Sequence, residues 1–125
     1  MANFTDDKIN TVWDNAQKVD GADPKIWRKD VCDAWINRDQ YGNESDYGWE
    51  IDHALPVAKN GTDHTSNLRA MQWQNNRSKG DDFPNYTASV TADGNKNVER
   101  KESKTVHQDT INRLKELYPS NQYLK

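Results

Sequence analysis

Cysteine is almost absent from this 125-residue chain, in which Cys32 is the only one. A single cysteine cannot form a disulfide within the chain, and it cannot supply a Cys-x-x-Cys pair for a zinc site. Both of these common means of stabilising a small protein are therefore excluded. Because a free cysteine usually behaves as a small hydrophobic residue, we expect Cys32 to pack in the core.

Long hydrophobic runs are also absent, since only 33% of the residues are hydrophobic. No stretch approaches the roughly 20 apolar residues of a transmembrane helix, so no membrane is expected as a partner. Residues 1–7 contain neither the basic nor the apolar segment of a signal peptide. A cytoplasmic location is therefore the simplest expectation.

Aliphatic residues are few, but aromatic residues make up 10% of the chain and include five tryptophans. A chain of this length favours one domain. We expect its small core to be built from a few large side chains rather than from many aliphatic ones. The five candidates for this role are Trp13, Trp27, Trp35, Trp49 and Trp73.

An excess of basic residues is lacking, because the formal net charge is −3. Residues 1–50 have six basic and eleven acidic side chains, whereas residues 51–125 have eleven basic and nine acidic ones. Proteins that hold nucleic acid through charge alone usually have a stronger basic face than this. Any contact with nucleic acid is therefore expected in the second part of the chain, with modest affinity from charge.

The N-terminal part of the chain is expected to begin with a helix. Thr5 is a suitable N-cap, and apolar residues recur at helical spacing over residues 5–19. Asp23, which is followed by a proline, has the pattern of a second helix start. The next segment is ambiguous, because residues 27–35 fit a helix whereas residues 34–37 also fit a short strand.

Strand and helix patterns follow one another in the rest of the chain and predict the α+β class. Regular strand pairing should stop before Pro56, and Gly80 should end a short helix. The expected elements are a strand within 48–57, a strand centred on 68–71, a helix at 73–79, a hairpin around Asp93 and Gly94, and a helix at 110–118.

Polar residues at a fixed spacing follow the first of these strands. Asp52 and His53 form an Asp-His pair. Asn67 lies 14 residues after His53, and Asn76 lies 9 residues after Asn67. With its flanking residues, this pattern over residues 47–81 resembles the HNH endonuclease family. Asparagine at the third motif position is similar to the HNH domains of homing nickases and CRISPR effectors.

The resemblance implies the ββα-metal fold, also called the His-Me finger, with residues 1–125 forming a single HNH nuclease domain. It implies that His53 is the general base and that Asn67 pins the loop after it. It also implies that Asp52 and Asn76 hold one divalent metal ion. Oxygen ligands favour Mg²⁺ or Mn²⁺, while Ni²⁺ and Zn²⁺ stay open as alternatives.

Two structural expectations follow from this chemistry. Neighbouring side chains on a strand point to opposite faces, so Asp52 and His53 can serve one site only if the strand bends or the ion lies at its edge. One ring nitrogen of His53 must take the proton of the attacking water. The other is expected to donate to a backbone carbonyl, which would fix the tautomer.

Basic residues close to the motif are candidates for contacts with phosphate groups. Arg77 and Lys79 flank Asn76 on the expected short helix, and Arg69 is a weaker candidate. The alternative interpretation is that these charges form a solvated helix face.

Three further residues are weaker candidates for the metal site. Glu50 lies two residues before Asp52, so it shares that face of the strand and is a candidate to assist the ion. His64 is a candidate to support the metal site from the turn, or else an exposed loop histidine. Asn75 is a neighbouring alternative to Asn76 as a ligand.

The sequence therefore predicts a metal-dependent endonuclease that hydrolyses DNA, by nicking, with RNA still open as a substrate. A non-catalytic nucleic-acid-binding module on the same fold is the first alternative, and a structural interaction domain is the second. A monomer or weak dimer is expected, and an immunity protein or a larger complex stays open as a partner.

Overall fold

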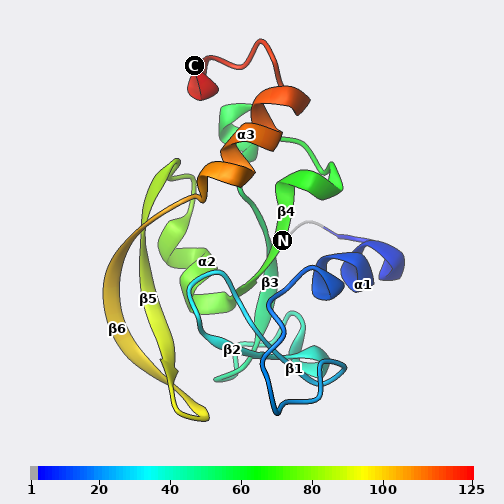
Figure 1. The fold of residues 1–125 in the computed structure, drawn as a ribbon, viewed down its shortest axis with the longest axis vertical. Coiled ribbons are helices and arrows are strands. Elements are labelled where there is room, and N and C mark those ends of the chain that lie inside the picture. The colour runs from blue at the N-terminus through cyan, green and yellow to red at the C-terminus, as the bar shows by residue number, and fades with distance from the viewer. Residues whose placement is uncertain (1–2) are drawn as a thin grey trace.

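The computed structural model describes residues 3–125, which form a mixed α+β fold with three α-helices and three two-stranded antiparallel sheets (Figure 1). Each sheet pairs two consecutive strands. The elements are α1 (Asp6–Asp14), β1 (Trp27–Lys29), β2 (Trp35–Asn37), β3 (Trp49–His53), β4 (Leu68–Gln72), α2 (Trp73–Lys79), β5 (Asn85–Asp93), β6 (Lys96–Thr105) and α3 (Gln108–Leu117).

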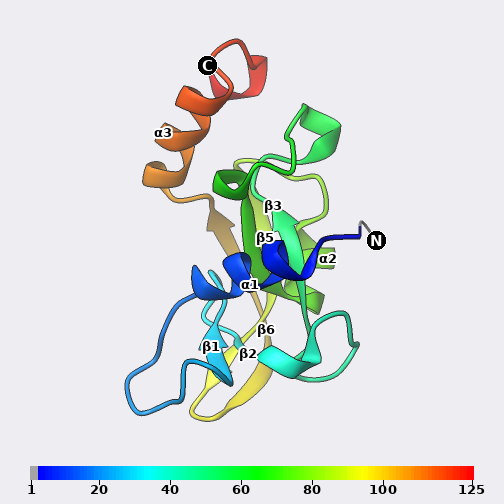
Figure 2. The same cartoon turned by 90° about the vertical axis from the view of Figure 1, so that its right-hand side faces the viewer.

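The β3–β4 pair and the helix α2 that follows it directly form the middle of the molecule. The curved β5–β6 hairpin lies beyond α2 on one side, and α1 lies on the other side (Figure 1). Both views place α3 at the end of the molecule that also holds the C-terminus (Figure 2). The β–loop–β–α order expected from the sequence is thus present, with α2 spanning the expected residues.

The two faces of the β3–β4 pair differ in chemistry. Trp49, Ile51, Leu68 and Ala70 pack in one cluster with the buried side of α1, including Trp13. Side chains alternate along a strand, so the residues between these point to the opposite face, toward α2. That opposite face carries charged groups, among them Glu50, Asp52 and Arg69.

The first helix is shorter than expected and the second is absent. The Thr5 side chain caps α1 as predicted, but α1 ends at Asp14 rather than near residue 19. The reason lies in Arg28, whose guanidinium donates to the carbonyl oxygens of Asp14 and Ala16. These carbonyl groups therefore have hydrogen-bond partners without a further turn of helix. The predicted helix start at Asp23 is wrong, because a turn there leads into β1.

The strand alternative for residues 34–37 is confirmed by β2. The β1–β2 hairpin is fastened to the centre by the buried carboxylate of Asp30. This carboxylate accepts hydrogen bonds from the backbone N–H groups of Cys32, Ala34 and Gln72, at 2.8 to 2.9 Å, and from Asn75 Nδ2 at 3.1 Å. A buried polar contact therefore joins two hairpins that are distant in sequence.

Cys32 is fully buried, as expected, with its Sγ 3.8 Å from the Tyr86 hydroxyl. Burial raises the pKa of the Cys32 thiol to about 12, so the thiol stays protonated at neutral pH. Among the tryptophans, Trp13 and Trp49 are buried, with ring centroids 5.4 Å apart. The expectation of a core role is wrong for the other three, which are only half-buried: Trp27, Trp35 and Trp73.

The hairpin and the last helix occur where the sequence predicts them, although β5 and β6 are longer than expected and α3 starts two residues earlier. Within residues 3–125, none of the helices has the length and apolar character needed to cross a membrane.

Candidate functional site

A depression of about 240 Å³ lies beside β3. It brings together three residues of the motif, namely Asp52, His53 and Asn76. The remaining lining residues come from β3, from the loop after it and from the end of α2: Ile51, Pro56, Val57, Gly80 and Asp81. Since no lining residue belongs to β4, the depression lies at the strand edge that β4 leaves open.

Alternation along β3 does separate Asp52 from His53, as the strand geometry requires. Asp52 pairs in register with Arg69 and faces α2, whereas the ring of His53 lies 6.1 Å from the ring of Phe4 on the other side. Both residues still line the same depression, because it opens at the edge where the two faces of the strand meet.

His53 has a partner that the sequence did not reveal. Its Nε2 lies 2.7 Å from Oδ1 of Asp63, so the expectation of a backbone carbonyl partner is wrong. An ionised carboxylate only accepts hydrogen bonds, so a neutral imidazole must carry its proton on Nε2. Nδ1 is then left as an acceptor. Asp63 was missed because it sits in an exposed turn with no spacing rule to relate it to His53.

Asn67 holds the loop that follows His53. Its Oδ1 accepts from the backbone N–H of Leu55 at 2.8 Å, and its Nδ2 donates to the carbonyl oxygens of Leu55 and Thr62, both at 3.0 Å. Gly61 is needed beneath this amide, because a Cβ there would lie 1.8 Å from the Leu55 oxygen. The loop is therefore tied at both ends by one buried side chain.

We expect the substitution Asn67→Ala to lower the free energy of unfolding by about 2 to 3 kcal/mol, because it leaves three buried or partly buried backbone groups without partners. Thermal or urea denaturation would measure this loss. The variant Asn67→Asp keeps the acceptor for the Leu55 N–H but loses both donated hydrogen bonds. Any stability that it retains over Asn67→Ala at pH 7 should come from that one remaining bond. An alanine variant as stable as the wild type would contradict the loop-pinning role.

Two buried carboxylates lie on the α2 face of β3. Asp52 is 4% exposed; its Oδ2 lies 2.9 Å from Arg69 Nε, and its Oδ1 lies 3.4 Å from Lys79 Nζ. Glu50 accepts from Asn76 Nδ2 at 3.1 Å and from Arg77 at 3.3 Å. Glu50 therefore orients the amide of Asn76, so that Oδ1 of Asn76 is the oxygen left for another partner.

Lys79 does not lie on a solvated helix face, and the prediction that it contacts phosphate is wrong. Its side chain is fully buried and its Nζ donates to the carbonyl oxygen of His53 at 3.1 Å. Burial lowers the pKa of Lys79, while the neighbouring Asp52 acts in the opposite direction. Lys79 thus joins the end of α2 to the end of β3, and its role is to position the strand that carries Asp52 and His53.

Arg77 and Arg69 differ in how far they reach solvent. Arg77 remains half-exposed, stacked 4.9 Å over Trp73 and paired with Glu44 at 2.6 Å. A phosphate contact by Arg77 would have to compete with Glu44. Arg69 has only 14% of its side chain exposed, because it is turned inward to Asp52.

Two of the weaker candidates lie away from the depression. Asn75 is fully buried and uses its amide on Asp30 and on the backbone of Ser89 and Val90, so it is not free to bind a metal ion. His64 is exposed, and its Nδ1 accepts from the backbone N–H of Ser66. Neither residue lines the depression.

The oxygen atoms available at the depression fit a hard divalent ion, and we expect them to bind it weakly. Within residues 3–125, no group of three or more His, Cys, Asp or Glu side chains is arranged to hold a metal ion. The candidate ligands are instead one carboxylate, Asp52, and one amide oxygen, Oδ1 of Asn76. Each Asp52 oxygen keeps a second lone pair after accepting from Arg69 or Lys79. These two cations reduce the negative charge available to an ion.

Comparisons of the chain with family models, with curated proteins and with solved structures give no match.

Proposed function

We propose that the protein is a metal-dependent endonuclease of the HNH type, which hydrolyses phosphodiester bonds in DNA. One observation carries this proposal: Asp52, His53 and Asn76 line a single depression, and Nε2 of His53 is hydrogen-bonded to Asp63. With its proton on Nε2, a neutral imidazole has Nδ1 as its acceptor. A module that only binds nucleic acid has no need for an oriented base.

In the proposed reaction, His53 takes a proton from the attacking water through Nδ1. The carboxylate of Asp63 stabilises the imidazolium that forms, in addition to fixing the tautomer. Two hydrogen bonds to the backbone keep the imidazole in place. Asn67 accepts from the N–H of Leu55, and Lys79 donates to the carbonyl oxygen of His53. Asp63 is a positioning residue, because it acts through His53.

Asp52 and Asn76 would hold one Mg²⁺ or Mn²⁺ ion by their oxygen atoms. A bound divalent ion supplies charge neutralisation at the phosphate and stabilises the leaving 3′ oxygen. Glu50 keeps the amide of Asn76 turned so that its oxygen is available. Arg77 lies on the same helix and is the remaining candidate for a phosphate contact near the cut.

The second candidate function is a nucleic-acid-binding module without catalysis. The ion pairs of Asp52 with both Arg69 and Lys79 favour this alternative, because they weaken a metal site. The two functions differ in whether any metal ion permits cleavage.

The test is nicking of supercoiled plasmid by the purified protein in EDTA and in Mg²⁺, Mn²⁺, Ni²⁺ or Zn²⁺, with a matched RNA substrate beside the DNA. We expect open-circular product with Mg²⁺ or Mn²⁺ and none in EDTA. Nicked circles should precede linear molecules, because one site cuts one strand in each encounter. If no metal ion permits cleavage of DNA or RNA, the endonuclease proposal fails and the binding module replaces it.

A further inference from the structure

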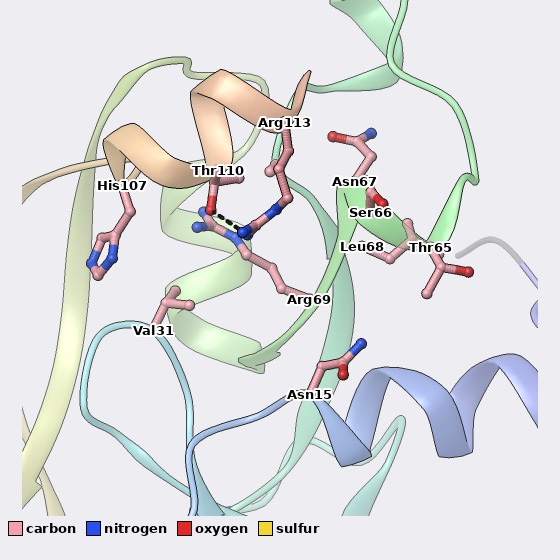
Figure 3. A pocket seen from close by; sticks show the side chains of 11 residues that line it. Asn15, Val31, Thr65, Ser66, Asn67, Leu68, Arg69, His107, Thr110 and Arg113 are labelled. Carbon is pink, nitrogen blue, oxygen red and sulfur yellow. Dashed lines mark hydrogen bonds between the residues drawn. The ribbon is translucent and has the colours of Figure 1, made fainter. Parts of the chain in front are cut away.

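A second and larger pocket, of about 460 Å³, lies between α3, β4 and the end of α1 (Figure 3). We name it the Arg69–Arg113 pocket. Its lining contains two arginines and no acidic residue, although the chain as a whole is acidic. Figure 3 shows the side chains of Arg69 and Arg113 directed toward the same part of the pocket, beside Thr110. Two guanidinium groups that converge in this way repel each other, and an anion bound between them would relieve the repulsion.

The charge of Arg69 is not fully balanced by its protein partners. Asp52 is the ion-pair partner of both Arg69 and Lys79, so one carboxylate is shared between two basic side chains. Nη2 of Arg69 is buried and has no hydrogen-bond partner among residues 3–125. A buried donor of this kind is normally satisfied by a protein group, an ordered water or a ligand.

Arg113 is similarly available. Within the described part of the chain, its side chain makes one hydrogen bond, a long one of 3.3 Å from Nη2 to the Thr110 hydroxyl, and no ion pair. The first turn of α3, which has no side-chain cap, contributes Thr110 and the adjacent His107 to the lining. Ser66 adds a hydroxyl from the opposite wall. Paired guanidinium groups with hydroxyl donors are the chemistry that recognises phosphate.

We propose that the Arg69–Arg113 pocket binds a phosphate group. The phosphate belongs either to a nucleic-acid backbone or to a free phosphate ion, and the same residues would contact both. The binding itself stands on the pocket alone, whereas a nucleic-acid source would also rest on the proposed function. Arg69 would then contact two groups at once, with Nε on Asp52 and the rest of the guanidinium on the phosphate.

The test compares Arg113→Gln with Lys115→Gln, because both residues lie on α3 and both changes remove one positive charge. Arg69 is left intact, since its substitution would also release Asp52. Lys115 does not line the pocket and serves as the matched control. All measurements are made in EDTA, so that binding is observed without cleavage. The result then does not depend on whether the protein is a nuclease.

The first measurement is calorimetric titration with sodium phosphate at constant ionic strength, with sodium chloride as the blank. The second is binding of a fluorescent single-stranded oligonucleotide that has hydroxyl groups at both ends. A free-phosphate site gives saturable phosphate binding that falls at least about tenfold in Arg113→Gln, with oligonucleotide binding unchanged. A backbone site gives the same loss for the oligonucleotide, with the salt dependence reduced by about one counterion. Equal behaviour of the two variants with both ligands would overturn the proposal.

Discussion

Replacing His53 with alanine is expected to abolish phosphodiester cleavage while leaving the protein folded. Removing a general base lowers the rate by roughly 10²- to 10⁴-fold, which would bring plasmid nicking below detection. The protein should stay folded, because the substitution removes only the ring contact with Phe4 and one hydrogen bond, to a carboxylate that is 60% exposed. A plasmid nicking assay, with the metal ion that supports wild-type cleavage, measures the loss of activity. A thermal unfolding curve measures the change in stability.

The matched control for this substitution is His64→Ala. His64 is an exposed histidine in the same loop region, and its ring touches the backbone of Ser66 rather than the depression. This variant should retain full activity. Calorimetric titration with Mg²⁺ or Mn²⁺ distinguishes a general base from a metal ligand at His53, because removal of a general base leaves the metal affinity unchanged. Lost metal affinity in His53→Ala would make the residue a ligand, and undiminished nicking would exclude it from the reaction.

Replacing Asp30 with alanine is expected to cause a larger loss of stability than Asn67→Ala. The substitution leaves three backbone N–H groups and one N–H of the Asn75 amide buried without an acceptor, while the other N–H of that amide still donates to Val90. Each such group costs about 1 to 3 kcal/mol, so a total loss of about 4 kcal/mol or more is expected. Since small domains are stable by only about 5 to 15 kcal/mol, the variant should be largely or wholly unfolded.

Urea denaturation in EDTA, followed by tryptophan fluorescence, measures this loss because Trp13 and Trp49 are both buried in the core. Asp20→Ala removes the same charge from an exposed position and should change the free energy of unfolding by less than about 0.5 kcal/mol. Asp30→Asn keeps one acceptor oxygen but turns an amide donor toward other donors, so it should fall between the two. A loss below about 1 kcal/mol in Asp30→Ala would show that the hairpin is held by other contacts.

The central elements were predictable because their signals are local. The helix α2 is bounded by a glycine with positive φ, Gly80, and the strand β3 ends ahead of Pro56. The stretch between Asn15 and Lys29 was not predictable in the same way. There the helix end is set by Arg28, which reaches back 12 to 14 residues to two carbonyl groups, and no periodicity in the sequence signals such a contact.

The same distinction holds for the candidate site. Spacing along the chain pointed to Asp52, His53 and Asn76, and these residues do lie around one depression. Spacing gave no information on their partners. A lysine in a polar helix is normally exposed, and Lys79 is buried only because Asp52 and the His53 carbonyl are there to receive its charge. Asp63 approaches His53 through the path of the loop, which depends on the hydrogen bonds of Asn67.

The pairing of consecutive strands in all three sheets also bears on how the chain folds. Contacts within each hairpin span fewer residues than the contacts between hairpins, so less entropy is lost in closing a hairpin than in docking one hairpin on another. The hairpins are joined to one another by polar side chains acting over long separations, such as Asp30 with Gln72 and Asn97 with Trp35. We therefore expect the hairpins to form early and their docking to limit the rate. Because these polar contacts form during docking, substitutions at Asp30 and Asn97 should slow folding as well as accelerate unfolding.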